Sequence, residues 1–459
     1  MWKNTLILFL FPLALSAQSD VSSLASILEY TAEADDYNGN ILVAQNGKVV
    51  YRGSFGVSRM NEDIPLDSAT VFRLASVSKQ FTALGIALLE NDGKLAYDDL
   101  LGKHIPELAF YEGVTIRHLL HHYGGLPDYM GMVIKAKDFD RVHNNKSIIE
   151  VMAARKPKVE FAAGTKSNYS NTGYLLLASV IEKLSGKTYS EFLAERVFEP
   201  FGMTRTSVPY PSNQLDENTA GSYAKNEKTG AYFQVDIGQD PFGYYVLADV
   251  VGDGMVHSTV DDLFRYSQGL LTDKILPADK RTVLTTPGNL EKGKGKYAFG
   301  QQITTSEEGM VVNHSGSWAG YLTYLERHPD KGNVIVALSN FDSPYSRMVR
   351  PAQRFLAGEK ITKPKVFTSI EIDAAILKDY TGTYELTVTK TTTFKFKASK
   401  GKLVMEVPNQ PKYELTPFQK DGFYLDGLDV DLTFTRDASG KVTGFDYYQR
   451  GVEGKGVKK

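Results

Sequence analysis

The sequence predicts an α/β (α+β) protein in which a mixed sheet carries a helical insertion and a small antiparallel barrel or sandwich follows it. Strand-like runs stand at residues 41–51, helical periodicity fills the middle of the chain, and strand-like runs return at residues 321–338. From residue 380 onward, short strands alternate with glycine turns. The chain has 459 residues, and at roughly 100–200 residues per domain this length indicates two or three domains.

The first strands form a predicted hairpin. Residues 22–33 have the spacing of an amphipathic helix, and residues 41–45 and 48–51 are rich in β-formers on either side of Asn46 and Gly47. An Asn-Gly pair between two such runs favours a tight hairpin turn, because both turn positions need a positive φ.

The helical insertion begins after residue 75. Phe81, Leu84 and Leu88 fall at positions i, i+3 and i+7, and Gly93 follows them as a stop signal. Strands before and after a helical stretch within one unit predict a single mixed sheet. The further elements expected are helices at residues 174–184 and 189–198, a helix start at residues 258–263, and strands at residues 321–326 and 333–338.

The C-terminal segment differs in character from the rest. Residues 359–366 resemble a linker, and residues 367–459 are long enough for a separate β-domain. We therefore place one domain at residues 20–358 and a β-barrel domain at residues 367–459. The aromatic side chains of the second domain are expected to pack a barrel core rather than line a ligand cavity. Its expected strands cover residues 393–397, 402–407, 423–425, 432–435 and 442–448.

Composition excludes several classes of function. Lys and Arg number 52 and Asp and Glu 54, which gives a formal net charge of -2. A near-neutral chain has no broad basic field, so nucleic acid is not expected as a partner. The lack of cysteine excludes disulfides, thiolate metal sites and cysteine nucleophiles. The sequence contains neither a phosphate-binding glycine loop nor a Gly-x-Ser-x-Gly elbow.

Residues 1–17 resemble a signal peptide. Lys3 supplies a positive charge, residues 5–15 are apolar, and small residues precede a predicted cleavage site after Ala17. The apolar run is too short to span a bilayer, although an N-terminal anchor helix is the alternative. No later stretch reaches 18 apolar residues. We expect the mature protein to be periplasmic or secreted, with no integral membrane segment after cleavage.

Three Ser-x-x-Lys sequences could supply a nucleophile and a base, and they begin at Ser76, Ser222 and Ser399. Ser399 lies in a predicted hairpin turn and Ser222 in a polar loop, where neither serine needs a chemical role. Only Ser76 starts a strongly apolar helix, in which Lys79 at i+3 shares its face. The N-terminal end of a helix also offers unpaired N–H groups that suit an oxyanion.

A lysine beside a serine has a chemical interpretation and a simpler one. A serine hydroxyl attacks a carbonyl efficiently only when a base removes its proton. Burial and a cationic neighbour lower the pKa of a lysine and free its amine to act as that base. In the simpler alternative, Ser76 is an N-cap and Lys79 a solvated residue of the first turn. Spacing alone favours the simpler alternative, so further motifs have to decide.

Two further motifs occur downstream. Tyr-x-Asn stands only at residues 169–171 in a chain with 26 tyrosines. A tyrosine can shuttle a proton, and an asparagine can fix the plane of a substrate amide. His-x-Gly stands at residues 314–316, where a glycine on an edge strand would let a substrate backbone approach. His-x-Gly also occurs at residues 122–124, so this motif is weak by itself.

In this order, the motifs resemble those of the serine β-lactamase and penicillin-binding-protein superfamily, and most of all its class C β-lactamase, D-aminopeptidase and esterase branch. Stretches at residues 115–122, 125–127 and 252–255 are similar to that branch as well. The resemblance covers about residues 22–345, and the tail is similar to the lipocalin-like β-domains often appended to such enzymes. It implies an antiparallel sheet flanked by helices, a helical subdomain and a C-terminal β-barrel.

The resemblance implies that Ser76 is the acylated nucleophile. Lys79 and Tyr169 would share the proton transfers as a coupled pair, whose pKa values belong to the pair. The resemblance implies no metal and no other cofactor. A zinc site is the alternative for the three histidines within residues 118–122, which fall at i, i+3 and i+4 but have no interleaved carboxylate.

The resemblance also implies the substrate-binding residues. Asn171 would orient the substrate amide or ester, Gly316 would let it approach the strand, and the N–H groups of Ser76 and Ser317 would form the oxyanion hole. His314 occupies the position of the lysine in the Lys-Thr-Gly motif of β-lactamases. A lysine carries the full charge that suits a β-lactam carboxylate, whereas a histidine is only partly charged near neutral pH. An esterase or a D-aminopeptidase is therefore favoured over a β-lactamase.

The sequence thus predicts an exported serine hydrolase that cleaves an amide or ester through an acyl-enzyme on Ser76. Its expected partner is a small-molecule or peptide substrate, a class that includes cell-wall fragments, D-amino-acid peptides, small esters and β-lactams. The alternative is a catalytically silent binding protein of the same fold, whose C-terminal barrel binds the ligand. The oligomeric state cannot be predicted from the sequence.

Overall fold

The computed structural model describes the chain from residue 21 onward, except for residues 35–36, 211–216, 227–228, 236–243, 291–292, 295, 307–308, 342, 344, 360, 362–366, 388–390, 409, 426–429 and 450–451. The predicted signal peptide and most of the predicted linker lie outside the described residues. Contacts between residues divide the chain into two compact units, one formed by Thr31–Leu356 and the other containing Ala357–Lys459.

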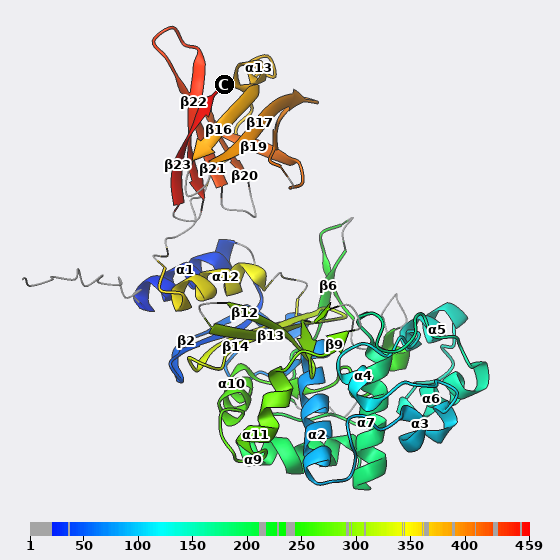
Figure 1. Cartoon of the computed structure of the whole chain (residues 1–459). Coiled ribbons are helices and arrows are strands. Elements are labelled where there is room, and N and C mark those ends of the chain that lie inside the picture. The colour runs from blue at the N-terminus through cyan, green and yellow to red at the C-terminus, as the bar shows by residue number, and fades with distance from the viewer. Residues whose placement is uncertain are drawn as a thin grey trace, which may run out of the picture. The chain divides into compact units, whose positions relative to one another are not determined.

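A seven-stranded antiparallel sheet forms the centre of the larger unit (Figure 1). Its strand order is β11–β12–β13–β14–β15–β1–β2. Every pairing is antiparallel, which confirms the sheet that the family resemblance implies and corrects the mixed sheet inferred from the order of elements alone. The strands are β1 (Gly39–Gln45), β2 (Lys48–Phe55), β11 (Tyr297–Ala298), β12 (Gln301–Ser306), β13 (Gly309–Trp318), β14 (Tyr321–His328) and β15 (Asn333–Ser339).

The β1–β2 hairpin brings the beginning of this unit next to its end. Asn46 and Gly47 take φ values of 52° and 72°, so the predicted turn is confirmed. On its other side β1 pairs with β15, so strands from the N-terminal and the C-terminal parts of the unit lie next to each other in one sheet. Helices α10 (Val260–Gly269) and α12 (Ser346–Leu356) both contact β1 and β15, and they cover opposite faces of the sheet (Figure 1). All of β15 is buried as a result.

The helical insertion lies between β2 and β11. Every residue from Lys79 to Leu89 in α2 is buried, so this helix is the centre of the insertion, and it packs against α7. The helices of the insertion, apart from α10, are α2 (Lys79–Asn91), α3 (Leu101–His104), α4 (Ile116–Leu120), α5 (Tyr129–Ala136), α6 (Asn145–Arg155), α7 (Asn171–Ser185), α8 (Tyr189–Leu193), α9 (Glu199–Phe201) and α11 (Ala278–Arg281). The helix predicted at residues 189–198 is α8 followed by a π-helical turn. The helix expected at residues 22–33 is α1 (Val21–Ala34).

Pairs of short strands connect these elements. The pair that matters for the site is β5 (Phe72–Arg73) with β8 (His257–Ser258), because β5 leads directly into the turn that carries Ser76. The other pairs are β3 (Val57–Arg59) with β4 (Ile64–Pro65), β6 (Tyr223–Lys225) with β7 (Tyr232–Gln234), and β9 (Asn289–Leu290) with β10 (Gly293–Lys294).

The C-terminal domain is a closed antiparallel barrel in which consecutive strands pair and β16 pairs with β23. All the predicted strands are present, and β16, β19 and β23 are added to them. Phe434 contacts five other aromatic rings inside the barrel, so large side chains fill the interior. Its elements are α13 (Leu377–Tyr380), β16 (Gly382–Thr387), β17 (Thr391–Ser399), β18 (Lys402–Glu406), β19 (Tyr413–Gln419), β20 (Gly422–Leu425), β21 (Val430–Arg436), β22 (Val442–Gln449) and β23 (Val452–Lys458).

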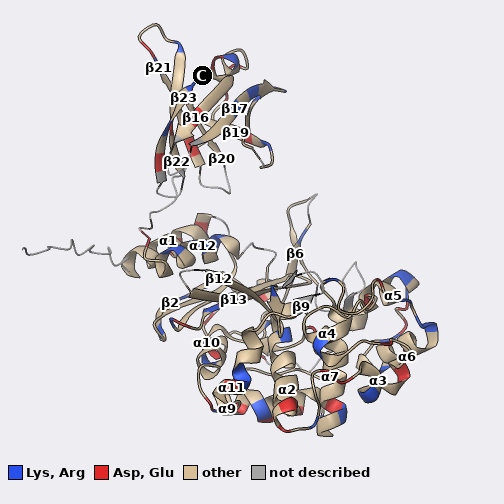
Figure 2. Ribbon diagram, viewed as in Figure 1, with Lys and Arg blue, Asp and Glu red and all other residues tan. Residues whose placement is uncertain are grey.

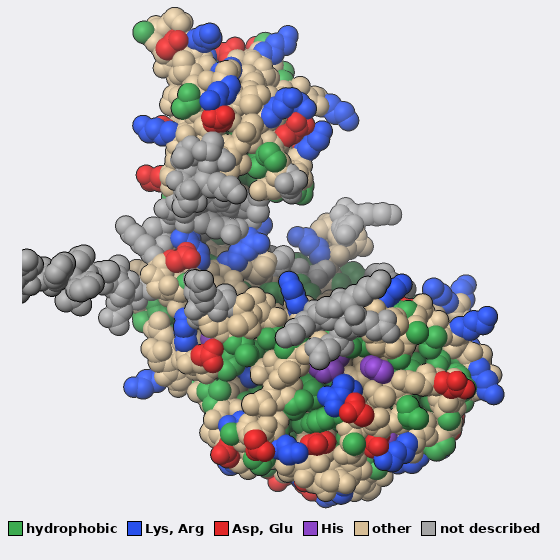
Figure 3. Space-filling model, viewed as in Figure 1, with side chains coloured by type: hydrophobic (Ala, Val, Ile, Leu, Met, Phe, Trp, Pro, Cys, Tyr) green, Lys and Arg blue, Asp and Glu red, His purple; other side chains and the backbone are tan. Residues whose placement is uncertain are grey.

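Basic and acidic residues are interspersed along the outer helices (Figure 2), and charged side chains of both signs occur on the face shown in Figure 3. None of the described helices combines the length and the apolar character that crossing a bilayer requires.

Candidate active site

Ser76 lies in a tight turn between β5 and α2. The turn is the 3₁₀ segment Ala75–Ser78, and Ala75 has a φ of 48°, an uncommon value for a residue with a Cβ. No side chain caps this turn or α2. The Ser76 hydroxyl instead lies 3.1 Å from Lys79 Nζ, which donates a hydrogen bond to it. The alternative in which Ser76 is a plain N-cap is therefore wrong.

Lys79 is fully buried and its amine is surrounded by acceptors. Besides Ser76 Oγ, Nζ donates to Asn171 Oδ1 at 2.7 Å and to the main-chain oxygen of Asp253 at 2.7 Å. Both of these are carbonyl oxygens, which can only accept. Two of the three positions around the nitrogen are thus fixed by the protein, and the third points at the Ser76 hydroxyl. The solvated first-turn lysine of the simpler alternative is wrong as well.

Tyr169 and Asn171 stand at the start of α7. Ser170 caps this helix by accepting from the Gly173 N–H, and the cap places Asn171 as the first helical residue. Lys79 Nζ lies 4.9 Å from the centre of the Tyr169 ring, within the range of a cation–π contact. The Tyr169 side chain is 46% exposed, and its hydroxyl makes no hydrogen bond to any described residue. The structure therefore brings the ring to Lys79 and leaves the hydroxyl available.

His122 supports the Tyr169 segment from behind. Its Nδ1 accepts from the Ser170 N–H at 3.1 Å, and its ring packs against Tyr169 and Tyr297 at 4.5 Å and 4.3 Å between centres. Burial, with a smaller contribution from Lys79, lowers the pKa of His122 well below its usual value. A buried, uncharged ring at this place holds Tyr169 against the lysine. This supporting role is not signalled by the sequence, in which His122 belongs to a weak His-x-Gly motif, to the zinc alternative and to the family-like stretch 115–122.

The zinc alternative for residues 118–122 has no support in the geometry. His118 Nδ1 accepts from the Thr115 N–H, and His121 Nδ1 bonds to the main-chain oxygen of Tyr297. With His122 bonded to Ser170, the three rings serve three separate local contacts. Among the described residues, no group of three or more His, Asp or Glu side chains could hold a metal ion.

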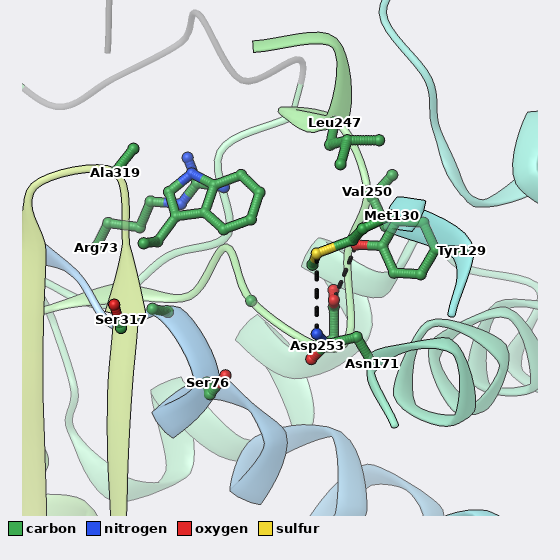
Figure 4. A pocket seen from close by; sticks show the side chains of 13 residues that line it. Arg73, Ser76, Tyr129, Met130, Asn171, Leu247, Val250, Asp253, Ser317 and Ala319 are labelled. Carbon is green, nitrogen blue, oxygen red and sulfur yellow. Dashed lines mark hydrogen bonds between the residues drawn. The ribbon is translucent and has the colours of Figure 1, made fainter. Parts of the chain in front are cut away.

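One edge of β13 is open beside Ser76. Residues 309–313 of β13 pair with β12, whereas residues 314–318 pair only with β14 among the described residues. Gly316 allows this stretch to pack against the turn, because a Cβ there would lie 2.3 Å from the Leu74 carbonyl oxygen. Ser317 is exposed and lies across the cleft from Asn171, on the same side as the open edge (Figure 4).

His314 is buried and bonded within the protein. Nδ1 donates to the Ser315 carbonyl oxygen at 2.6 Å, so Nε2 accepts from the Tyr297 hydroxyl at 3.0 Å. Burial, together with the charge of Lys79, lowers the pKa of His314 to about 3. The expectation of a partly charged ring is therefore corrected: His314 is neutral at physiological pH. Since both ring nitrogens are occupied, it has no donor left for a substrate carboxylate.

The cleft opens over Ser76 with a volume of about 240 Å³. Arg73 and Ala319 lie on one side of the cleft (Figure 4). The Arg73 guanidinium lies over the ring of Trp318, another lining residue, 4.8 Å from its centre. The opposite wall is mostly apolar. It consists of Tyr129, Met130, Leu247, Val250 and Asp253 (Figure 4).

Asp253 is a site residue that the sequence analysis did not identify. Its main-chain oxygen binds Lys79, and its Oδ2 accepts from the buried Tyr129 hydroxyl at 2.9 Å. Burial raises the pKa of this carboxyl, while Lys79 and the Tyr129 hydrogen bond act to lower it. Gly252 makes the turn possible, with a φ of 105° and a Cβ position only 2.4 Å from the Tyr174 carbonyl oxygen. In the sequence, the stretch 252–255 shows only a similarity to the family.

Comparison with known proteins agrees with this geometry. The family model described as Beta-lactamase matches residues 30–359, and a domain of unknown function, DUF3471, matches residues 368–455. Penicillin-binding protein 4* of Bacillus subtilis (strain 168) is 34% identical over 454 residues, which cover 96% of this chain and 99% of that protein.

Two solved structures show the same fold. The octameric penicillin-binding protein homologue from Pyrococcus abyssi has a TM-score of 0.65 and 25% identity, over 95% of this chain and 100% of its own. D-amino acid amidase from Ochrobactrum anthropi SV3, complexed with L-phenylalanine amide, has a TM-score of 0.60 and 22% identity, over 74% and 98%. Since the family model covers more than half of the sequence and a 34% identical relative spans nearly all of it, the chain belongs to the β-lactamase family, within the superfamily of serine β-lactamases and penicillin-binding proteins.

Proposed function

We propose that the protein is an exported serine hydrolase that cleaves an amide or ester through an acyl-enzyme on Ser76. The observation that carries this proposal is the arrangement around Lys79 Nζ. Two carbonyl oxygens, from Asn171 and Asp253, accept two of its hydrogens. In the neutral amine, the lone pair is then directed at the Ser76 hydroxyl, which is the orientation a general base needs.

Acylation follows from this orientation. The Ser76 proton passes to Lys79 as the Ser76 oxygen bonds to the substrate carbonyl carbon, and the carbonyl oxygen takes up the negative charge. The N–H groups of Ser76 and Ser317 are the donors that we assign to this oxyanion. When the intermediate collapses, the bond to the leaving nitrogen or oxygen breaks. The leaving group takes a proton from Lys79, either directly or through the hydroxyl of Tyr169, a half-exposed residue whose ring centre lies 4.9 Å from Lys79 Nζ.

Deacylation uses the same groups in reverse. A water molecule attacks the ester on Ser76 and gives a proton to Lys79, either directly or through the Tyr169 hydroxyl, which passes its own proton on to the amine. The carbon–oxygen bond to Ser76 then breaks, and Ser76 regains its proton. The acid product leaves, and no metal or other cofactor is required for this sequence of steps.

The substrates that we favour are small esters and D-aminoacyl amides or peptides, including cell-wall fragments, over β-lactams. The neutral state of His314 supports this preference, because β13 then offers no charged side chain for a β-lactam carboxylate. The name of the Ochrobactrum anthropi neighbour says that it acts on D-amino acid amides. The name of the Bacillus subtilis relative says that it binds penicillin, so slow acylation by a penicillin is expected as a side reaction.

Intact-mass spectrometry with a fluorophosphonate and with benzylpenicillin tests the acyl-enzyme. Wild type should gain the mass of one probe, and Ser76→Ala should gain none. Ser222→Ala is the matched control, because Ser222 also begins a Ser-x-x-Lys sequence but lies buried next to β6. The absence of an adduct on wild type, or an equal adduct on Ser76→Ala, contradicts the proposal. Mass spectrometry of the mature N-terminus tests export, and we expect it to show cleavage after Ala17.

A further inference from the structure

The cleft has a single carboxylate among the described residues that line it, and it belongs to Asp253. The side chain lies in the wall that is otherwise built from Tyr129, Met130, Leu247 and Val250 (Figure 4). An ionised group in apolar surroundings is costly unless a partner compensates it. Its position therefore calls for an explanation in terms of a ligand.

The carboxyl group is held in place without an ion pair to any described cation. Tyr129 donates a hydrogen bond to Oδ2 and the main-chain N–H of Asp253 donates a second to the carboxylate, whereas a carboxylate can accept about four. Burial raises the pKa of this carboxyl overall, and Lys79, the Tyr129 hydrogen bond and Arg73 only oppose that rise. Lys79, however, directs its hydrogen bond to the main-chain oxygen of Asp253, and no described cation forms an ion pair with the carboxylate. The site is thus oriented by a phenol and has acceptor capacity left.

The carboxylate is also close to the reacting atoms. Ser76 and Asp253 line the same cleft, and Lys79 Nζ bonds to both Ser76 Oγ and the main-chain oxygen of Asp253, which fixes the residue that bears the carboxylate beside the nucleophile. In an aminoacyl group the ammonium is attached to the carbon next to the carbonyl. When that carbonyl is bonded to Ser76, its ammonium has to lie within a few ångströms of the serine oxygen. The side chain of such an amino acid could then rest on the apolar wall of Met130, Leu247 and Val250.

We propose that the Asp253 carboxylate binds the α-ammonium group of the substrate, so that this protein prefers amino-acid amides and peptides with a free N-terminus over N-acylated ones. This inference rests on the proposed acyl-enzyme at Ser76. Asp253 is here a specificity-determining residue, and Tyr129 is a positioning residue that acts through it. A charged acceptor in an apolar wall discriminates strongly, because an uncharged group in place of the ammonium leaves the carboxylate without a partner.

The test compares kcat/KM for alanine p-nitroanilide and N-acetylalanine p-nitroanilide, each in the D and L configurations. Wild type should prefer the free amine by about 10-fold or more in the better configuration. Asp253→Asn should reduce this preference by about 10-fold or more. Tyr129→Phe, which keeps the carboxylate, should retain a preference for the free amine. Asp279→Asn removes an exposed carboxylate on α11 and should leave the preference as in wild type.

The ratio of the two substrates separates recognition from structural damage. If Asp253→Asn lowers both rates by the same factor, the carboxylate has only a structural role and the inference is wrong. If Asp253→Asn does not fold, the ratio of kcat/KM for the free-amine and N-acetylated anilides in wild type decides. Equal values of kcat/KM for the two substrates overturn the inference. Failure of the proposed function looks different: wild type would then take up no probe at Ser76 and hydrolyse neither anilide.

Discussion

Gly316 packs directly against the carbonyl oxygen of Leu74, and a Cβ on Gly316 would lie 2.3 Å from that oxygen. Leu74 precedes the turn of Ser76, and its carbonyl also accepts a hydrogen bond from Thr323 Oγ1 on the neighbouring strand at 2.7 Å. Strands β13 and β14 are therefore fixed to the nucleophile turn by their contacts with the Leu74 carbonyl oxygen, through the main chain of Gly316 and the side chain of Thr323. The distance between Ser76 and the open edge of β13 depends on this contact.

Gly316→Ala should consequently push β13 away from the turn. A displacement of about 1 Å in a catalytic constellation can cost about 10²-fold in rate. We expect kcat/KM for p-nitrophenyl acetate to fall by about that factor. Gly173→Ala in α7 is the control, because its Cβ would meet Leu119 only at ordinary contact distances of 3.6 Å and more. Equal activity in both variants would show that the close contact does not set the geometry of the site.

Lys79→Met should slow acylation strongly while leaving the cleft in place. The variant removes the base and leaves two carbonyl oxygens, of Asn171 and Asp253, without their donor. General-base catalysis contributes about 10²–10⁴-fold, and we expect a loss of that size in ester hydrolysis. Each unsatisfied buried acceptor costs about 1–3 kcal/mol of folding free energy, so the unfolding temperature should fall as well. Lys280→Met removes a partly exposed lysine on α11 and should keep wild-type activity.

Tyr169→Phe removes the hydroxyl and keeps the ring, so it distinguishes the roles of the two. The phenyl ring keeps the contacts with Lys79 and His122, so the unfolding temperature should stay within a few degrees of wild type. Without the hydroxyl, proton delivery to the leaving group slows, and kcat should fall by about 10²-fold. Tyr210→Phe, another exposed tyrosine, is the control. If Tyr169→Phe hydrolyses amides at the wild-type rate, the hydroxyl takes no part in proton transfer.

The elements that sequence predicts well are those with local causes. The hairpin at Asn46 and Gly47 follows from two positive φ values. The turn at Lys400 and Gly401, with φ values of 50° and 77°, accounts for the third Ser-x-x-Lys sequence in the same way. The strand order of the sheet has no such local cause. The pairing of β1 with β15 joins residues about 300 positions apart, and only the resemblance to a family indicated an antiparallel sheet.

The same distinction between local and distant causes applies to the residues of the site. Ser76, Lys79, Tyr169 and Asn171 were found because their side chains form motifs. Asp253 contributes to Lys79 through a main-chain oxygen, which every residue has, so no residue type could signal it. The charge of His314 was misjudged for a related reason. Its neutral state depends on burial and on Tyr297, a partner 17 positions earlier in the chain that the motif does not include.

His257 predicts an acid-sensitive fold. It is fully buried beside Arg73, neither ring nitrogen has a hydrogen-bond partner, and burial lowers its pKa to about 3. The unfolded chain takes up this proton near pH 6.5 and the folded chain only near pH 3. Stability should therefore fall as the pH drops through this window, by up to about 1.4 kcal/mol per pH unit for this residue.

Urea unfolding at pH 7 and pH 5 checks the contribution of His257. His257→Leu, which replaces an unbonded polar ring with an apolar side chain of similar size, should lose less stability between the two pH values than wild type. His314 has the same low pKa and remains in the variant, so the pH dependence should shrink without disappearing. An identical loss in both proteins would mean that His257 does not titrate with folding.

The packed interior of the barrel predicts that its stability can be changed separately from catalysis. Phe434 is 3% exposed and touches the rings of Tyr380, Tyr384, Phe396 and others in a core distinct from that of the larger unit. Phe434→Ala leaves a large cavity, and substitutions of this kind cost about 3–5 kcal/mol. In calorimetry, we expect one of two transitions to move to lower temperature while the other stays in place. Hydrolysis of p-nitrophenyl acetate by the full chain should be retained below the lower transition. In the wild-type barrel the aromatic rings fill the interior and leave no room for a ligand. A barrel that binds a ligand inside would therefore need a cavity of the kind that Phe434→Ala creates.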